Sequence, residues 1–93
     1  EAINFAGAFA DCAIGFVRRR QDRAIVVIVP RLSSRVGFPP VGQRWQDTHA
    51  NLVSGLSALR DVFSDREVRA ENSKLKLSEA MAEVPFAVFC SGP

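Results

Sequence analysis

Hydrophobic and polar positions change in short runs along this chain, and the clearest run covers residues 23–30. Five β-branched residues in a row, Ile25 to Val29, favour a pleated strand over a helix. Successive side chains of a strand point to opposite faces, so the even-numbered residues share one face and the odd-numbered residues share the other. Both faces are apolar. The pattern therefore predicts a central strand that is covered on both sides.

Other short runs predict further strands around this one. A strand over residues 12–19 precedes it, with Cys12, Ile14 and Phe16 expected on the core face, and Arg20-Gln21-Asp22 forms the hairpin turn between the two. Later alternating runs predict strands at residues 48–53 and 59–63, around Val68, at 74–77 along an exposed edge, and at 86–90. A short helical turn is expected from Ser78 to Ala82.

Short strands joined by turns, without a long amphipathic helix, predict an all-β fold. We expect a small antiparallel β-sandwich with one or two short helical turns. Residues 1–93 make a single domain, in which residues 1–11 form an irregular lead-in to the first strand. The chain starts at Glu1 without an initiator Met and has little mass to cover both faces of a central strand. We therefore expect it to be a piece of a larger protein.

Charge adds one local feature to this picture. The net charge of +2 does not demand a polyanionic partner, but Arg18, Arg19, Arg20 and Arg23 surround the predicted hairpin turn. This cluster is either a phosphate-binding patch or a solvated tip that keeps a sheet edge soluble. The second interpretation is favoured because no nucleic-acid-binding signature accompanies the arginines. We expect no nucleic-acid partner, and no membrane partner, since the longest apolar run is about one strand long.

Candidate catalytic and metal-binding residues are few. His49 is the single histidine and no C-x-x-C pair is present, so the sequence predicts neither a metal site nor another cofactor. There is also no nucleophile elbow and no nucleotide-binding loop. Four carboxylates lie close in sequence at Asp61, Asp65, Glu67 and Glu71. A glycosidase needs such a pair, but the arginines among them favour a salt-bridged surface.

The two cysteines leave two interpretations open. A disulfide between Cys12 and Cys90 would close a long loop and stabilise the fold by a few kcal/mol. Both residues have apolar neighbours in sequence, which is typical of buried free thiols. We favour free thiols, because two cysteines are too few for a scaffold built on disulfides.

Trp45 and Phe38 are the residues that could contact a sugar, because a flat apolar ring complements a pyranose face. A lone Trp after a loop rich in Pro and Gly more often closes the edge of a core. We expect Trp45 to pack in the core. We also expect Asp47 or Thr48 to bond backbone amides at the start of the next strand.

The order and spacing of several short motifs resembles the C-terminal end of the malto-oligosyltrehalose synthases, a family within the α-amylase superfamily. In that family a strand of the type R-A-V-x-V-V-V-P-R-L is followed by W-x-D-T and by a terminal P-V-A-L-L segment. The resemblance covers nearly the whole chain from about Ile14 onward. The motifs that carry it are Phe16-Val17-Arg18-Arg19, Arg23 to Leu32, Trp45-x-Asp47-Thr48, Leu59 to Phe63, Leu75 to Ala80, and Val84 to Phe89.

This resemblance implies a non-catalytic C-terminal β-domain whose partner is the (β/α)8 catalytic barrel of the same parent enzyme. The whole enzyme would convert the reducing-end α-1,4 linkage of a maltodextrin into an α,α-1,1 linkage by intramolecular transglycosylation. The catalytic loops of such a barrel have no counterpart in this chain, so no catalytic residue is transferred and no activity is expected of the chain alone. A cytoplasmic location is implied.

Two function classes remain at this stage. The first is the structural β-domain of that synthase, with an apolar face shaped for another domain. The second is a stand-alone carbohydrate- or protein-binding module, with two or more exposed aromatic side chains on one face or groove. If the barrel covers one face of the strand at residues 23–30, the separate chain is expected to self-associate as a symmetric dimer.

Overall fold

The computed structural model describes residues 2–21, 23–31, 35–37, 39–52 and 58–91. Two antiparallel sheets contain the strands, which confirms the small all-β sandwich expected from the sequence. In chain order the elements are β1 (Asn4–Ala6), the 3₁₀ helix η1 (Ala10–Cys12), β2 (Ala13–Arg20), β3 (Arg23–Pro30), the 3₁₀ helix η3 (Gly42–Trp45), β4 (His49–Asn51), β5 (Ala58–Asp61), β6 (Glu67–Arg69), β7 (Lys74–Lys76), α1 (Leu77–Ala80) and β8 (Ala87–Ser91).

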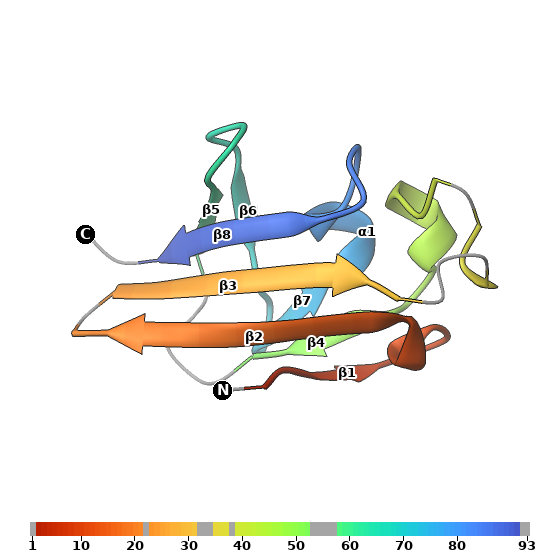
Figure 1. Ribbon diagram of the computed structural model, residues 1–93, viewed down its shortest axis with the longest axis horizontal. Coiled ribbons are helices and arrows are strands. Elements are labelled where there is room, and N and C mark those ends of the chain that lie inside the picture. The colour runs from red at the N-terminus through yellow and green to blue at the C-terminus, as the bar shows by residue number, and fades with distance from the viewer. Residues whose placement is uncertain (1, 22, 32–34, 38, 53–57, 92–93) are drawn as a thin grey trace.

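The larger sheet has five strands in the order β2-β3-β8-β5-β6. Its longest strand pair is the hairpin of β2 and β3 at one edge of the sheet, where the two strands pair along their full length from Ala13 opposite Pro30 to Arg20 opposite Arg23. The turn begins at Gln21, whose φ of 58° lies in the left-handed region. The predicted hairpin is therefore confirmed, with β3 ending at the expected proline. In Figure 1, β5 and β6 stand at a steep angle to β3 and β8, as expected of a strongly twisted sheet.

The smaller sheet has three strands in the order β1-β4-β7. The alternating Lys74-Leu75-Lys76 segment forms its edge strand β7, as predicted. The expectation that residues 1–11 are irregular is wrong, because Asn4–Ala6 pairs with His49–Asn51 as β1. Three residues are too few to show a period of two in the sequence. Pairing with β4, rather than the local pattern, makes this segment a strand.

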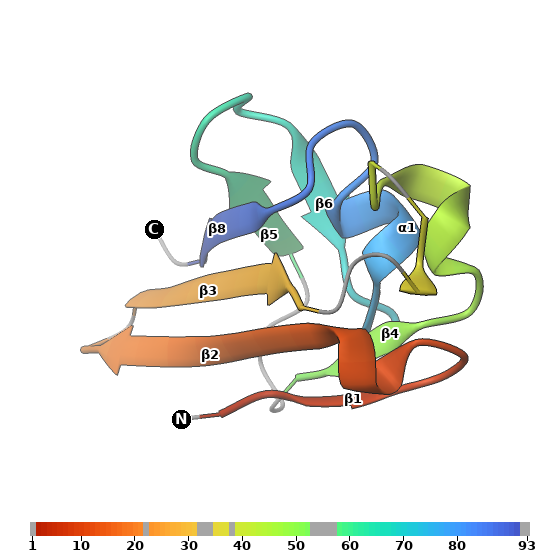
Figure 2. The same ribbon diagram turned by 45° about the vertical axis from the view of Figure 1, so that its right-hand side comes forward.

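The core lies between the two sheets and around α1 and η3. Its largest fully buried side chains are Trp45, Phe89, Ile28, Leu59, Leu75, Leu77 and Met81. Figure 2 shows α1 and η3 side by side at one end of the sandwich. Trp45 reaches the core from η3, where its indole nitrogen donates a hydrogen bond to the Pro40 carbonyl at 2.7 Å. The expectation that Trp45 packs in the core is confirmed.

The predicted core face of β2 is wrong, although the strand itself is present. Ala13, Gly15 and Val17 point inward, while Ile14 and Phe16 are 50% and 44% exposed. Gly15 explains the register: a Cβ atom there would lie 2.7 Å from the Val27 carbonyl oxygen and 3.1 Å from the Ile3 side chain. The backbone of β2 approaches its neighbours closely on this side, and only glycine fits. Gly15 has no side chain and adds nothing to a hydropathy pattern. The pattern therefore placed Ile14 and Phe16 on the core face, which is the wrong face.

Strand β5 ends two residues earlier than expected, at Asp61 rather than Phe63. The Asp61 carboxylate accepts hydrogen bonds from the backbone amides of Phe63 at 2.8 Å and Ser64 at 3.1 Å. A short acidic side chain that captures the next amides starts a turn. The alternation of apolar and polar residues therefore continues past the end of the strand.

Replacement of Trp45 by Ala is expected to destabilise the fold by about 3–5 kcal/mol, because it removes the largest buried side chain and leaves a cavity. Chemical denaturation followed by circular dichroism measures this change. The matched variant Phe63→Ala removes a ring that is 71% exposed and should cost no more than about 1.5 kcal/mol. A Trp45→Ala protein that unfolds like the parent and loses affinity for maltodextrin would instead make Trp45 a binding residue.

Candidate functional site

On β2, β3 and β8 of the five-stranded sheet the outward side carries a continuous set of apolar residues, and no second layer covers it within the part of the chain that the structure describes. We call this side the open face. Its apolar members are Ile14, Phe16, Ile25, Val27, Val29 and Val88. Figure 1 looks toward it, with β2, β3 and β8 in front of β4 and β7.

Strand register makes the open face continuous across three strands. Ile14 of β2 lies opposite Val29 of β3, and Phe16 lies opposite Val27. Val27 in turn lies opposite Val88 of β8. Side chains directly opposite one another on one face of a sheet are in contact distance. These residues therefore form one patch rather than scattered exposed positions.

The sequence predicted that both faces of β3 are covered, and the structure covers only one. Ala24, Val26 and Ile28 are buried against the core, whereas Ile25 and Val29 remain 46% and 40% exposed. A sandwich that covers both faces of β3 from within the described residues is thereby excluded. Apolar side chains on an uncovered sheet stay in contact with water and gain little from folding, which makes the open face the candidate surface for interaction.

One end of the open face is basic. Arg18 and Arg20 continue the outward row of β2, and Arg23 begins the outward row of β3, with Arg20 directly opposite Arg23. All of them are exposed at the hairpin tip, and none makes an ion pair with another described residue. Arg19 lies on the other side of the same strand. The sheet therefore divides the arginine cluster predicted from the sequence. Arg18, Arg20 and Arg23 lie on the outward side, and Arg19 lies on the opposite side.

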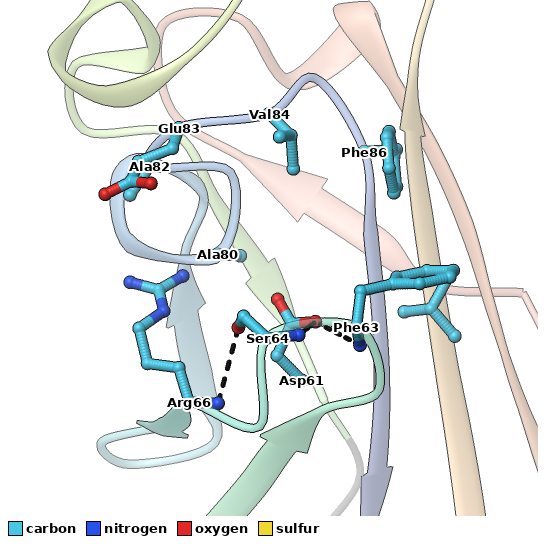
Figure 3. Close-up of a pocket in the computed structure, with 10 residues that line it drawn as sticks. Asp61, Phe63, Ser64, Arg66, Ala80, Ala82, Glu83, Val84 and Phe86 are labelled. Carbon is cyan, nitrogen blue, oxygen red and sulfur yellow. Dashed lines mark hydrogen bonds between the residues drawn. The ribbon is translucent and has the colours of Figure 1, made fainter.

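A cavity of about 220 Å³ lies beside the open face, between the turn after β5 and the segment after α1. Figure 3 shows Phe63 and Phe86 on one side of it and Arg66 on the other. The two rings have centroids 5.6 Å apart and stand at 90°. Two of its polar side chains are already engaged, since Asp61 holds the turn amides and Arg66 donates to the Glu79 carbonyl oxygen. The cavity is smaller than the roughly 300–1,000 Å³ of small-molecule sites.

The residues considered as sugar contacts do not form a site. Trp45 is fully buried, so its ring has no free face for a pyranose. Phe38 lies outside the residues that the structure describes. Among the described residues the exposed aromatic side chains are Phe16, Phe63 and Phe86, none of which was expected from the sequence to contact a sugar. An aromatic residue next to a turn or at the start of a strand gives no signal of its exposure before the register is known.

The Trp45-x-Asp47-Thr48 motif, just before β4, is hydrogen-bonded to the turn that follows β1. The Asp47 carboxylate accepts from the Ala8 amide at 2.9 Å, and the Thr48 hydroxyl accepts from the Phe9 amide at 3.0 Å. The Thr48 hydroxyl also donates to the Trp45 carbonyl oxygen at 2.6 Å. The expectation that these side chains bond backbone amides is confirmed, but the amides belong to the lead-in and not to the next strand. The motif is structural and holds the turn after β1.

Of the four carboxylates near β5 and β6, Asp65 and Glu67 form the salt-bridged surface that was expected, whereas Asp61 holds a turn. Arg60 lies 3.2 Å from Asp65 and 3.9 Å from Glu67, and Arg69 lies 3.3 Å from Glu67. All of these side chains are largely exposed, so the pairs add little stability. They also leave no isolated carboxylate pair of the kind that glycoside hydrolysis requires.

The cysteines differ in environment. Cys12 is fully buried while Cys90 is exposed, and both are free thiols. The expectation of two buried thiols is therefore wrong for Cys90, which lies on the outward side of β8 opposite Ile25. Burial raises the pKa of the Cys12 thiol, and the nearby Asp11 carboxylate raises it further. Arg35, bonded to Asp11, lowers the pKa of that carboxyl group.

Other chemistry is sparse in the described residues. His49 is half-buried at the start of β4, with Nδ1 3.1 Å from the Asp47 carbonyl oxygen. The described ranges contain no group of three or more His, Cys, Asp or Glu side chains placed to hold a metal ion. They also contain no helix long and apolar enough to cross a bilayer. No family model, curated protein or solved structure matches the chain.

Thiol modification should distinguish the two cysteines. In dilute native protein at mildly alkaline pH, an aromatic disulfide reagent is expected to modify Cys90 and leave Cys12 unmodified, because a buried thiol of raised pKa supplies little accessible thiolate. The native protein should release one equivalent of the reagent's aromatic thiol per chain, and the denatured protein should release two equivalents. The control variant Cys90→Ser should release none until it unfolds. Rapid modification of Cys12 in the folded variant would contradict the described core.

The open face should also cause the separate chain to self-associate. We expect sedimentation equilibrium over a range of concentrations to show a monomer and a symmetric dimer that buries part of this face. Val27→Asp, which places a charge at its centre, should leave only monomer. The matched variant Asn51→Asp adds a similar charge on the exposed side of the smaller sheet and should dimerise like the parent. A strict monomer at the highest soluble concentration would contradict this expectation.

Proposed function

We propose that this chain is the non-catalytic C-terminal β-domain of a malto-oligosyltrehalose synthase and that its open face packs on the enzyme's catalytic barrel. The observation that carries the proposal is the apolar open face, on a sheet whose strand β3 buries its other side in the core. The whole enzyme, a cytoplasmic protein, rearranges the reducing-end linkage of a maltodextrin into a trehalose linkage. The motif order between Phe16 and Phe89 supports this choice of partner.

Apolar area is the physical reason for such docking. Burial of apolar surface contributes about 25 cal/mol for each Å² removed from water. Ile14, Phe16, Ile25 and Val29 are each at least 40% exposed, so a second layer over them would contribute several kcal/mol before the cost of association. The pairing of β2 with β3 along eight residues keeps the face rigid. A rigid apolar face is what stable contact between two domains requires.

Catalysis is assigned to the barrel and not to this chain. The carboxylates near β5 and β6 are paired with arginines or hold a turn, and Trp45 supports the core. The chain's role in this proposal is therefore mechanical: it covers and orients part of the barrel, while maltodextrin contacts the barrel loops.

The alternative function, a stand-alone carbohydrate- or protein-binding module, has one observation in its favour. Phe63 is 71% exposed and stacks with Phe86 beside the cavity. A sugar platform needs ring faces that lie in one plane along a groove, whereas these two rings stand at 90°. The open face contains more apolar residues than the pair of Phe63 and Phe86 and is continuous across three strands. Docking on a protein domain is therefore the better supported function.

A binding experiment tests the proposal. The chain is expected to bind the catalytic barrel of a malto-oligosyltrehalose synthase that lacks its own C-terminal β-domain, with one chain per barrel in isothermal titration calorimetry. Cys90 lies among the open-face residues, so its thiol should become protected from modification in the complex. With maltohexaose as substrate, the chain alone should release neither a trehalose-ended product nor glucose.

Two variants make this test specific. Val27→Asp should abolish binding, because it buries an unpaired charge at the centre of the contact. Asn51→Asp should bind like the parent chain. A chain that leaves the barrel unbound and Cys90 fully reactive in the mixture refutes the proposal, as does turnover of maltohexaose by the chain alone.

A further inference from the structure

We infer that the surface that covers the open face carries carboxylates opposite Arg18, Arg20 and Arg23, so that the contact is apolar at one end and ionic at the other. This inference rests on the proposed function and specifies the chemistry of the docking partner. It gives the three arginines a role in recognition of the partner, whereas a solvated hairpin tip would give them no such role.

The geometry places apolar and basic residues in one plane. On β2 the outward residues run from Ile14 through Phe16 to Arg18 and Arg20. On β3 they run from Val29 through Val27 and Ile25 to Arg23. A layer that covers the apolar rows therefore extends over, or ends beside, the guanidinium groups. Arg18 lies directly opposite Ile25, so water cannot be removed from Ile25 without partly desolvating Arg18.

Desolvation then dictates the partner's chemistry. A charged group that loses water without gaining a partner costs several kcal/mol. Arginine recovers that cost best with a carboxylate, through paired N–H···O hydrogen bonds in one plane. The separate chain supplies no such partner to these arginines among its described residues. In the proposed docking we therefore expect the covering surface to supply the carboxylates.

The chain also carries a repulsion that such a partner would relieve. Arg20 and Arg23 form a directly opposed pair at the end of the hairpin, and like charges in that position destabilise a sheet. A carboxylate placed between them converts the repulsion into attraction. The repulsion remains in the uncovered hairpin, so the gain is made only in the docked state.

A second copy of the chain does not meet this requirement. Two open faces related by a twofold axis place the arginines of one copy against either the arginines or the apolar end of the other. Two of the described acidic residues near β5 and β6, Asp65 and Glu67, already pair with Arg60 and Arg69. Self-association is therefore expected to be weaker than docking on an acidic partner and to weaken less as salt is added.

Charge reversal with a matched control tests the inference. The triple variant Arg18→Glu/Arg20→Glu/Arg23→Glu should bind the same catalytic barrel at least about tenfold more weakly than the parent chain, through a faster dissociation and a slower association. The control is Arg19→Glu, an exposed arginine on the same strand whose side chain lies on the other side of the sheet. Arg19→Glu should bind within about twofold of the parent.

Salt dependence gives a second readout. A second variant, Arg18→Lys/Arg20→Lys/Arg23→Lys, keeps the positive charge. An increase in NaCl from about 0.05 M to about 0.5 M should weaken barrel binding by the parent chain and by this lysine variant. The same increase should not weaken barrel binding by the triple glutamate variant. Equal binding by the parent and the triple glutamate variant would overturn the inference and leave the proposed docking intact. Failure of the parent to bind at all would instead overturn the docking. Tight binding of the parent to vesicles of anionic phospholipid, lost in the triple glutamate variant, would assign these arginines to a lipid surface and overturn the inference.

Discussion

One-sided burial of the five-stranded sheet is the constraint on which the rest of this structure depends. The chain buries Ala24, Val26 and Ile28 of β3 and leaves the alternate residues uncovered. Since a strand exchanges its two faces with a shift of one residue, the packing of Gly15 against β3 and Ile3 fixes which face is buried. The apolar face that remains is then a fixed, rigid surface, and the basic hairpin tip is a fixed part of it.

The smaller sheet and the 3₁₀ helix η3 make this arrangement possible with few residues. Trp45 fills the end of the core, and Asp47 and Thr48 hold the turn that follows β1. These contacts join segments 39 residues apart in sequence, so the short strand β1 is placed against β4 by side chains of the loop before β4. All of these described segments lie on one side of the larger sheet, and none of the residues that the structure describes forms a layer on the other side.

The sequence was sufficient where a local pattern decides the structure. The β-branched strand β3, its hairpin with β2 and the edge strand around Leu75 appear as predicted, although Leu77, which was expected in that strand, begins α1. It was insufficient where tertiary contact decides. The side of β2 depends on the missing Cβ of Gly15, the strand β1 depends on its partner, and the end of β5 depends on one hydrogen-bonding carboxylate. The candidate site was predicted only in part. The sequence predicted the apolar outer row of β3, but it placed Ile14 and Phe16 of β2 in the core instead of beside that row.

The central claim is that the open face is an interior surface of a larger protein. The most direct test is a crystal structure of the intact protein that contains this sequence. We expect Ile25, Val27 and Val29 to be buried against another domain of that protein, and carboxylates of that domain to contact Arg18, Arg20 or Arg23. A structure in which these side chains face solvent, while every other domain packs elsewhere, would contradict the claim.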